Sequence, residues 1–132
     1  MNPPLPGPSL LAALADAVEV AAEEAAHRAL KHFPDGHGGD RDSVLRAFRA
    51  HGTAANLAAY ALRTEAGSAN PDWDNARDLW HTLLNLAGPF HDHPEIPEEL
   101  RETLAEWEAA ASDRAADADA PFSARTSSAG RP

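Results

Sequence analysis

Residues 9–33, SLLAALADAVEVAAEEAAHRALKHF, carry a helix pattern from which the fold can be predicted. This stretch contains neither glycine nor proline and is rich in alanine, the strongest helix former. Its apolar residues recur every three or four positions, the spacing of one face of a packed helix. The residues on this face are Leu11, Leu14, Val18, Ala21 and Ala25. The stretch therefore predicts a long helix, which Pro34 and Gly36 end.

The same spacing extends through residues 42–66, although this segment contains Gly52. A glycine inside a helix costs only about 1 kcal/mol relative to alanine, so one continuous helix is expected. The alternative is an irregular five-helix domain with a break at Gly52. The apolar positions that stay in one phase through the glycine are Val44, Phe48, His51, Ala55, Ala58 and Leu62.

Two further helices are expected. Residues 71–87 follow Asn70, a capping residue, and residues 97–113 begin at Pro97 with two glutamates in the first turn. Short connections are typical of antiparallel neighbours in bundles. The sequence therefore predicts an all-α, up-down-up-down four-helix bundle. Trp73, Trp80 and Trp107 fall on the apolar faces, where core packing is expected.

The helices are expected to form one domain. Residues 1–8 form a proline-rich lead-in, residues 9–113 the bundle, and residues 114–132 a disordered tail of small and polar residues. Alanines cover nearly every face of the first helix, and a helix that is apolar on most sides is often covered on more than one side. We therefore expect a homo-oligomer.

Charge and composition exclude several classes of partner. The formal net charge is −10, from 11 basic and 21 acidic residues, and no basic stripe is visible. Nucleic acid and anionic membranes both require such a stripe, so neither is expected as a partner. The chain has no cysteine, no secretory signal and no run of about 20 apolar residues, so a cytoplasmic protein is expected. Abundant alanine and arginine with a single lysine, Lys31, favour a bacterial source.

The histidines suggest one candidate site. In an up-down-up-down bundle, the first and third connections lie at the same end. That end would carry His32, His37, His91, Asp92 and His93, with His27 and His81 deeper as further candidates. Imidazoles with carboxylates are ligands for divalent transition metals such as zinc or iron. Because histidine titrates near neutral pH, the cluster could sense protons instead, or it could be only a polar helix connection.

No residue has a setting that identifies it as a catalyst, so enzyme activity is not expected. Two carboxylate–x–x–His pairs, Glu24 with His27 and Asp78 with His81, have the spacing of di-iron bundles. Such a site also needs an acid from each of the other two helices, and residues 42–66 have none near His51. The sequence favours a protein-interaction or regulatory module that binds a protein partner or itself, without a cofactor. The alternative is a metal-binding bundle or a metal-dependent enzyme.

Overall fold

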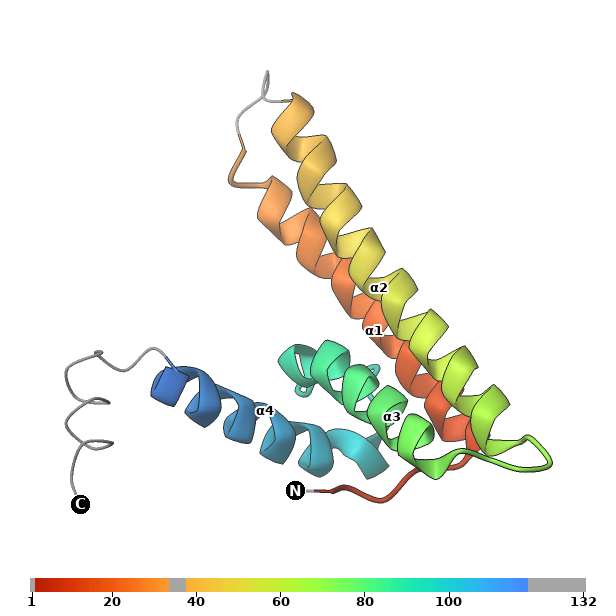
Figure 1. Cartoon of the computed structure of the whole chain (residues 1–132). Helices are drawn as coiled ribbons and strands as arrows, with labels where there is room; N and C mark the ends of the chain where they lie inside the picture. The colour runs from red at the N-terminus through yellow and green to blue at the C-terminus, as the bar shows by residue number, and fades with distance from the viewer. Residues whose placement is uncertain (1, 34–37, 119–132) are drawn as a thin grey trace, which may run out of the picture.

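The computed structural model describes residues 2–33 and 38–118, and Figure 1 shows the arrangement of its helices. Within these ranges the chain has no strand, so it is the all-α four-helix bundle that the sequence predicts. The elements are α1 (Pro8–Leu30), α2 (Gly38–Ala66), α3 (Trp73–Ala87), the short 3-10 helix η1 (Gly88–Phe90) and α4 (Glu98–Ala118).

The two longest helices, α1 and α2, lie side by side and antiparallel along their whole length (Figure 1). Helix α2 runs without interruption through Gly52, which is buried against α1. The prediction of one continuous helix is therefore confirmed, and the alternative of a five-helix domain broken at Gly52 is wrong. The apolar spacing predicted this correctly, because the free-energy cost of one glycine in a helix is small compared with the stabilisation from packing a whole helix face.

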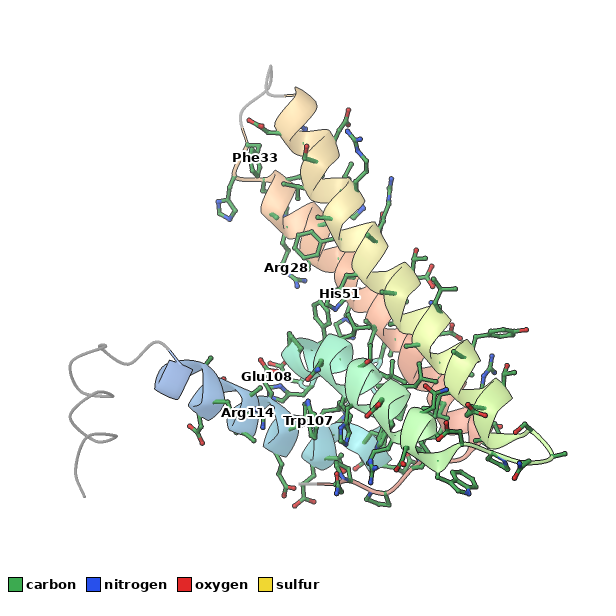
Figure 2. All side chains as sticks on the ribbon, viewed as in Figure 1. Arg28, Phe33, His51, Trp107, Glu108 and Arg114 are labelled. Atoms are coloured by element: carbon green, nitrogen blue, oxygen red, sulfur yellow. The ribbon has the colours of Figure 1, made fainter. Side chains whose placement is uncertain are left out.

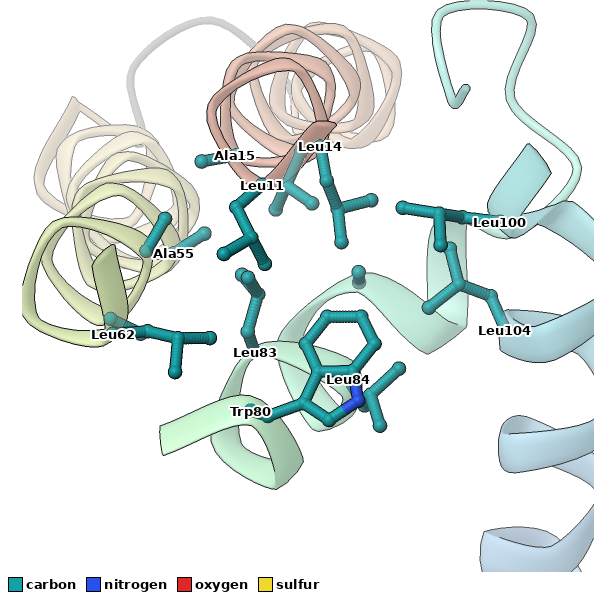
Figure 3. Packing of buried hydrophobic residues seen from close by; sticks show 14 of the residues in the cluster. Leu11, Leu14, Ala15, Ala55, Leu62, Trp80, Leu83, Leu84, Leu100 and Leu104 are labelled. Carbon is teal, nitrogen blue, oxygen red and sulfur yellow. The ribbon is translucent and has the colours of Figure 1, made fainter. Parts of the chain in front are cut away.

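The core lies where α3 and α4 cover one half of this hairpin. Figure 3 shows leucines of all four helices converging around Trp80. Trp107 joins α4 to α3, because its Nε1–H donates to Asn85 Oδ1 at 2.8 Å and its ring lies 4.9 Å from the ring of His81. The largest fully buried side chains are Trp80, Leu11, Leu14, Leu62, Leu83, Leu84, Ile96, Leu104 and Val18.

The helices differ in length, and this difference determines the shape of the molecule. At a rise of 1.5 Å per residue, α2 with its 29 residues is about 43 Å long, whereas α3 with its 15 residues is about 22 Å long. Helices α3 and α4 therefore cover only the half of the hairpin that contains the start of α1. The other half, around the α1–α2 connection, projects beyond them (Figure 1).

The boundaries of the hairpin helices differ from those expected. Helix α1 ends at Leu30 and residues 31–33 form a turn, while α2 begins at Gly38, four residues before the expected Asp42. Arg41 explains how α1 ends, because its Nη1 donates to the carbonyl oxygens of Leu30 at 3.0 Å and Phe33 at 3.3 Å. A side chain of α2 thus adds hydrogen bonds at the C-terminal end of α1 and in the turn that follows it.

The later helices also differ in detail. Asp72, rather than Asn70, caps α3, since its Oδ1 accepts from the Asn75 amide at 3.1 Å. Helix α4 continues to Ala118, five residues past the expected end, because residues 114–118 still include the helix formers arginine and alanine. The rest of the expected tail, residues 119–132, lies outside the described residues, as do residues 34–37. In the described part of the chain, no helix has the length and apolar character needed to cross a membrane.

Candidate functional site

His93 links the connection after η1 to the side of α1. Its Nε2 lies 2.7 Å from Glu24 Oε2, and its Nδ1 accepts a hydrogen bond from the Glu95 amide at 3.1 Å. A carboxylate can only accept, so Nε2 carries the proton and both ring nitrogens are engaged. The His93 side chain is only 11% exposed. These contacts give His93 a structural role, since a metal ion could bind either nitrogen only by displacing one of them.

His51 and His91 fix the C-terminal end of α3. His51 Nε2 donates to the carbonyl oxygen of Leu86 at 2.7 Å, and the His51 ring meets the ring of Phe90 edge-on at 5.6 Å. His91 Nδ1 donates to the carbonyl oxygen of Gly88 at 2.9 Å. Because a carbonyl oxygen only accepts, these contacts identify the ring nitrogen that carries the proton. His51 therefore marks the level at which η1 meets the hairpin.

The other predicted ligands are exposed, contact other residues, or lie outside the described residues. His32 is exposed in the turn after α1, and Asp92 is exposed between His91 and His93. The two deeper candidates have other neighbours: His27 Nε2 lies 3.5 Å from Glu23 Oε1, and the His81 ring packs on Trp107. His37 lies outside the described residues.

These residues do not form a metal site within the part of the chain that the structure describes. Among residues 2–33 and 38–118, no group of three or more histidine, aspartate or glutamate side chains is close enough to hold a metal ion. His37 belongs to neither range. The assignment of His32, His37, His91, Asp92 and His93 as metal ligands therefore stays a prediction.

The two connections that carry these histidines lie at different levels along the hairpin. The connection after α3 contacts α2 at His51, near the middle of that helix, and α1 at Glu24, six residues before that helix ends. Helix α1 continues from Glu24 to Leu30, a further distance of about 9 Å. The sequence predicts that the two connections face each other at one end of the bundle, but α3, with 15 residues, is too short to bring them to the same level.

The projecting half of the hairpin leaves part of an apolar helix face uncovered. Val44 and Phe48 continue the three-four spacing of Ala55 and Leu62, which are fully buried in the core. Val44 and Phe48 are only half-buried, and none of residues 39–51 is buried. Ala25 is half-buried at the corresponding level of α1. We call Ala25, Val44 and Phe48 the open hairpin face.

Figure 2 shows which labelled side chains surround this face. Phe33, Arg28 and His51 lie along the side of the hairpin above α3 and α4. An ion pair joins the two helices at the same level, with Arg49 Nη2 3.1 Å from Glu23 Oε1. The hydrogen bond from Arg49 lowers the pKa of Glu23, and the same bond raises the pKa of Arg49. The open hairpin face is thus apolar, and the exposed Arg28 lies beside it.

The structure also shows a groove that the sequence did not predict. The lead-in lies along α3, and Trp80 Nε1–H donates to the carbonyl oxygen of Pro3 at 3.1 Å. Trp80 is buried as expected, but Trp73 is 59% exposed, so its assignment to the core is wrong. The α3 residues that face the lead-in across this groove are Trp73, Ala76, Arg77, Trp80 and His81, and we call them the α3 groove.

A sequence signal for the α3 groove does exist. Trp73 and Trp80 are seven residues apart, which places both rings on one face of α3. Pro3 and Pro6 form a Pro-x-x-Pro pattern in the lead-in. The sequence does not show that these two segments are in contact, because helices α1 and α2 lie between them along the chain.

Comparison with known proteins gives no assignment. No protein-family model matches the chain, and no match is found among curated proteins or solved structures.

Proposed function

We propose that this chain is a protein-interaction module that associates with a second copy of itself through the open hairpin face. The observation that carries the proposal is the apolar spacing of α2, which continues through Phe48 and Val44 beyond the point where α3 ends. A helix with an apolar stripe is stable when that stripe is covered by another element. The same face is covered at Ala55 and Leu62 and uncovered at Val44 and Phe48.

A second copy fits this face because it brings the same two helices. Two hairpin ends packed around a two-fold axis would form a local four-helix bundle, and such symmetric pairs are the commonest oligomers. The cytoplasmic location expected from the sequence stays part of this proposal.

The alanines of α1 support the proposal less than the sequence suggested. Ala15, Ala17, Ala21, Ala22 and Ala26 are all buried within the single chain. They let α1 and α2 pack closely, so their abundance does not require a partner. The support for self-association comes instead from Val44 and Phe48.

Sedimentation velocity over a range of protein concentrations tests the proposal. We expect wild-type protein to form a dimer, Phe48→Asp to be monomeric, and Leu57→Asp to remain dimeric. Leu57 is the matched control, because it lies on the same helix, is 64% exposed and is not part of the open hairpin face. Circular dichroism of each variant verifies that the helices remain folded.

A second measurement does not depend on a disruptive substitution. The chain has no cysteine, so Ala47→Cys gives a single attachment point for a spin label next to Phe48. Dimerisation through the open hairpin face predicts a short distance between the two labels, and a label at Leu57 predicts a longer one. Wild-type protein that stays monomeric at all concentrations, or a Leu57→Asp variant as monomeric as Phe48→Asp, would contradict the proposal.

A further inference from the structure

The α3 groove already holds a peptide, which is the chain's own lead-in. Residues 2–6 belong to neither a helix nor a turn, and Gly7 continues them with φ −68° and ψ 165°, an extended conformation. Pro3, Pro4 and Pro6 have no amide hydrogen and hold their own φ near about −65°. The lead-in is therefore stiff and extended before it contacts α3.

The contacts match the way in which proteins recognise proline-rich segments. Such segments lie in grooves lined by aromatic rings, and the low entropy of the extended chain favours binding. In the α3 groove Trp80 donates its indole N–H to the Pro3 carbonyl oxygen, while Trp73 lies at the edge of the groove. Among the described residues, this is the only hydrogen bond made by residues 2–6.

The lead-in fills the α3 groove incompletely. A cavity of about 110 Å³ remains between Pro3 and Leu5 on one side and the α3 residues on the other. Trp73 stays 59% exposed and Leu5 36% exposed. His81 also lines this cavity, and its buried Nε2 has no hydrogen-bond partner within the described part of the chain. A well-matched ligand normally leaves few such gaps, so a better-fitting peptide could replace the lead-in.

We propose that the α3 groove binds a proline-rich segment of a partner protein, and that the lead-in competes for the same place. The occupant is inferred from the lead-in itself, of which Asn2, Pro3 and Leu5 line the groove now, while Pro6 lies in a separate pocket with Leu11 and Arg63. This surface is separate from the open hairpin face, and the inference does not depend on self-association.

Exchange of the lead-in for a partner leaves the bundle intact. The lead-in precedes α1, whose first turn is closed by the bond from the Leu11 amide to the Gly7 carbonyl oxygen. Residues 2–6 can therefore leave the groove without unwinding α1. A tethered segment competes at an effective concentration in the millimolar range, so it weakens partner binding without abolishing it.

Fluorescence anisotropy with a labelled synthetic peptide tests the inference on the full chain. The peptide is MNPPLPGPSLL, residues 1–11, and its control carries alanine in place of both Pro3 and Pro6. We expect weak binding to wild-type protein and binding about tenfold tighter to a protein with Pro3→Ala and Pro6→Ala in its own lead-in. The control peptide should bind neither protein.

Variants of the groove identify the site of binding. In the protein with the weakened lead-in, Trp80→Phe removes the N–H donor and should reduce affinity about tenfold or more. Tyr60→Phe is the control, because it removes the hydroxyl group of an exposed aromatic ring on α2 that does not line the α3 groove, so affinity should not change. Trp73→Ala changes an exposed ring at the groove edge, and it should weaken binding even if Trp80→Phe impairs folding.

Two outcomes would overturn the inference. One is a peptide whose affinity for the protein with the weakened lead-in is no higher than its affinity for wild type, or is unchanged by Trp73→Ala. The other is a wild-type dimer that dissociates when Pro3 and Pro6 become alanine, because the groove would then hold the lead-in of a second copy rather than a partner protein.

Discussion

Gly52 of α2 lies directly against the backbone of Glu19 of α1, so close that a Cβ atom at position 52 would be 3.1 Å from Glu19 Cα. The atom it would meet is part of a helix backbone, which cannot move aside as the end of a side chain can. Gly52 is therefore required by the approach of the two helices. It neither breaks nor kinks α2.

Gly52→Ala should destabilise the protein, although alanine is the better helix former. The helix propensity gain of about 1 kcal/mol is outweighed by an overpacking cost of about 1–3 kcal/mol. Gly39→Ala is the matched control on the same helix, since a Cβ there meets nothing within 4 Å. Urea unfolding should show a lower free energy of unfolding for Gly52→Ala only. Equal or higher stability of Gly52→Ala would mean that α1 can move away from α2.

Asn85→Ala should weaken the attachment of α4 to α3. It removes the acceptor of the partly buried Trp107 Nε1–H, and an unpaired donor of this kind costs about 1 kcal/mol or more. Asn56→Ala is the control, because the hydrogen bond from Asn56 to Glu19 is exposed and should contribute less. Chemical unfolding of both variants measures the difference, and equal losses would show that the Trp107 bond has no special weight.

Stability should depend on pH through the Glu23–Arg49 ion pair. The pKa of Glu23 is lowered below its usual 4.5 by the hydrogen bond from Arg49, so the folded state favours the carboxylate. This contribution is present above about pH 4.5 and is lost as the pH falls through the lowered pKa. The stability difference between wild type and Glu23→Gln should therefore shrink from about pH 7 to about pH 3.

The partner of Glu23 can be checked by a double-mutant cycle at neutral pH. In an Arg49→Gln background, Glu23→Gln should have a smaller effect than in wild type, because the hydrogen bond is already absent. A pH-dependent difference that persists in the Arg49→Gln background would assign the lowered pKa to another group, such as His27.

His81→Phe should leave stability unchanged or raise it. The buried Nε2 of His81 has no hydrogen-bond partner among the described residues, and a phenylalanine ring can keep the contact with Trp107. His93→Phe is the contrasting variant, since it removes two hydrogen bonds and should lower the melting temperature. A large loss of stability in His81→Phe would show that Nε2 is hydrogen-bonded in solution.

Elemental analysis of protein purified without a histidine tag tests the metal prediction. We expect no stoichiometric metal, because His93 uses both ring nitrogens and His91 uses one in hydrogen bonds. Bound zinc or iron that disappears in a His91→Ala, His93→Ala double variant would instead establish the site predicted from the sequence.

The sequence predicted the helices well because their signal is local. Apolar spacing carried α2 correctly through Gly52, where a rule that treats glycine as a helix breaker would have failed. It predicted the relation between the two histidine connections less well. That relation depends on where α3 ends. If α3 is a few turns shorter than the hairpin helices, the histidines of the two connections are too far apart to bind the same metal ion.

The α3 groove could not be predicted from the sequence, for a different reason. Trp73 and Trp80 have the same spacing as core residues, and only the path of the lead-in shows that one ring lines a groove and stays exposed. His93 is a similar case, since its pattern suits a ligand as well as a structural link. Its hydrogen bonds to Glu24 and Glu95 show the structural link, while its role as a ligand stays a prediction.

The bond between Trp80 and Pro3 also has a consequence for the order of folding. It joins residues 77 positions apart, whereas the α1–α2 hairpin joins neighbours along the chain. Local pairings carry the smaller loop-closure cost and form early, and long-range pairings form late. During synthesis on the ribosome, Pro3 would therefore reach its final place only after the third helix has been made, well after the residues of the hairpin.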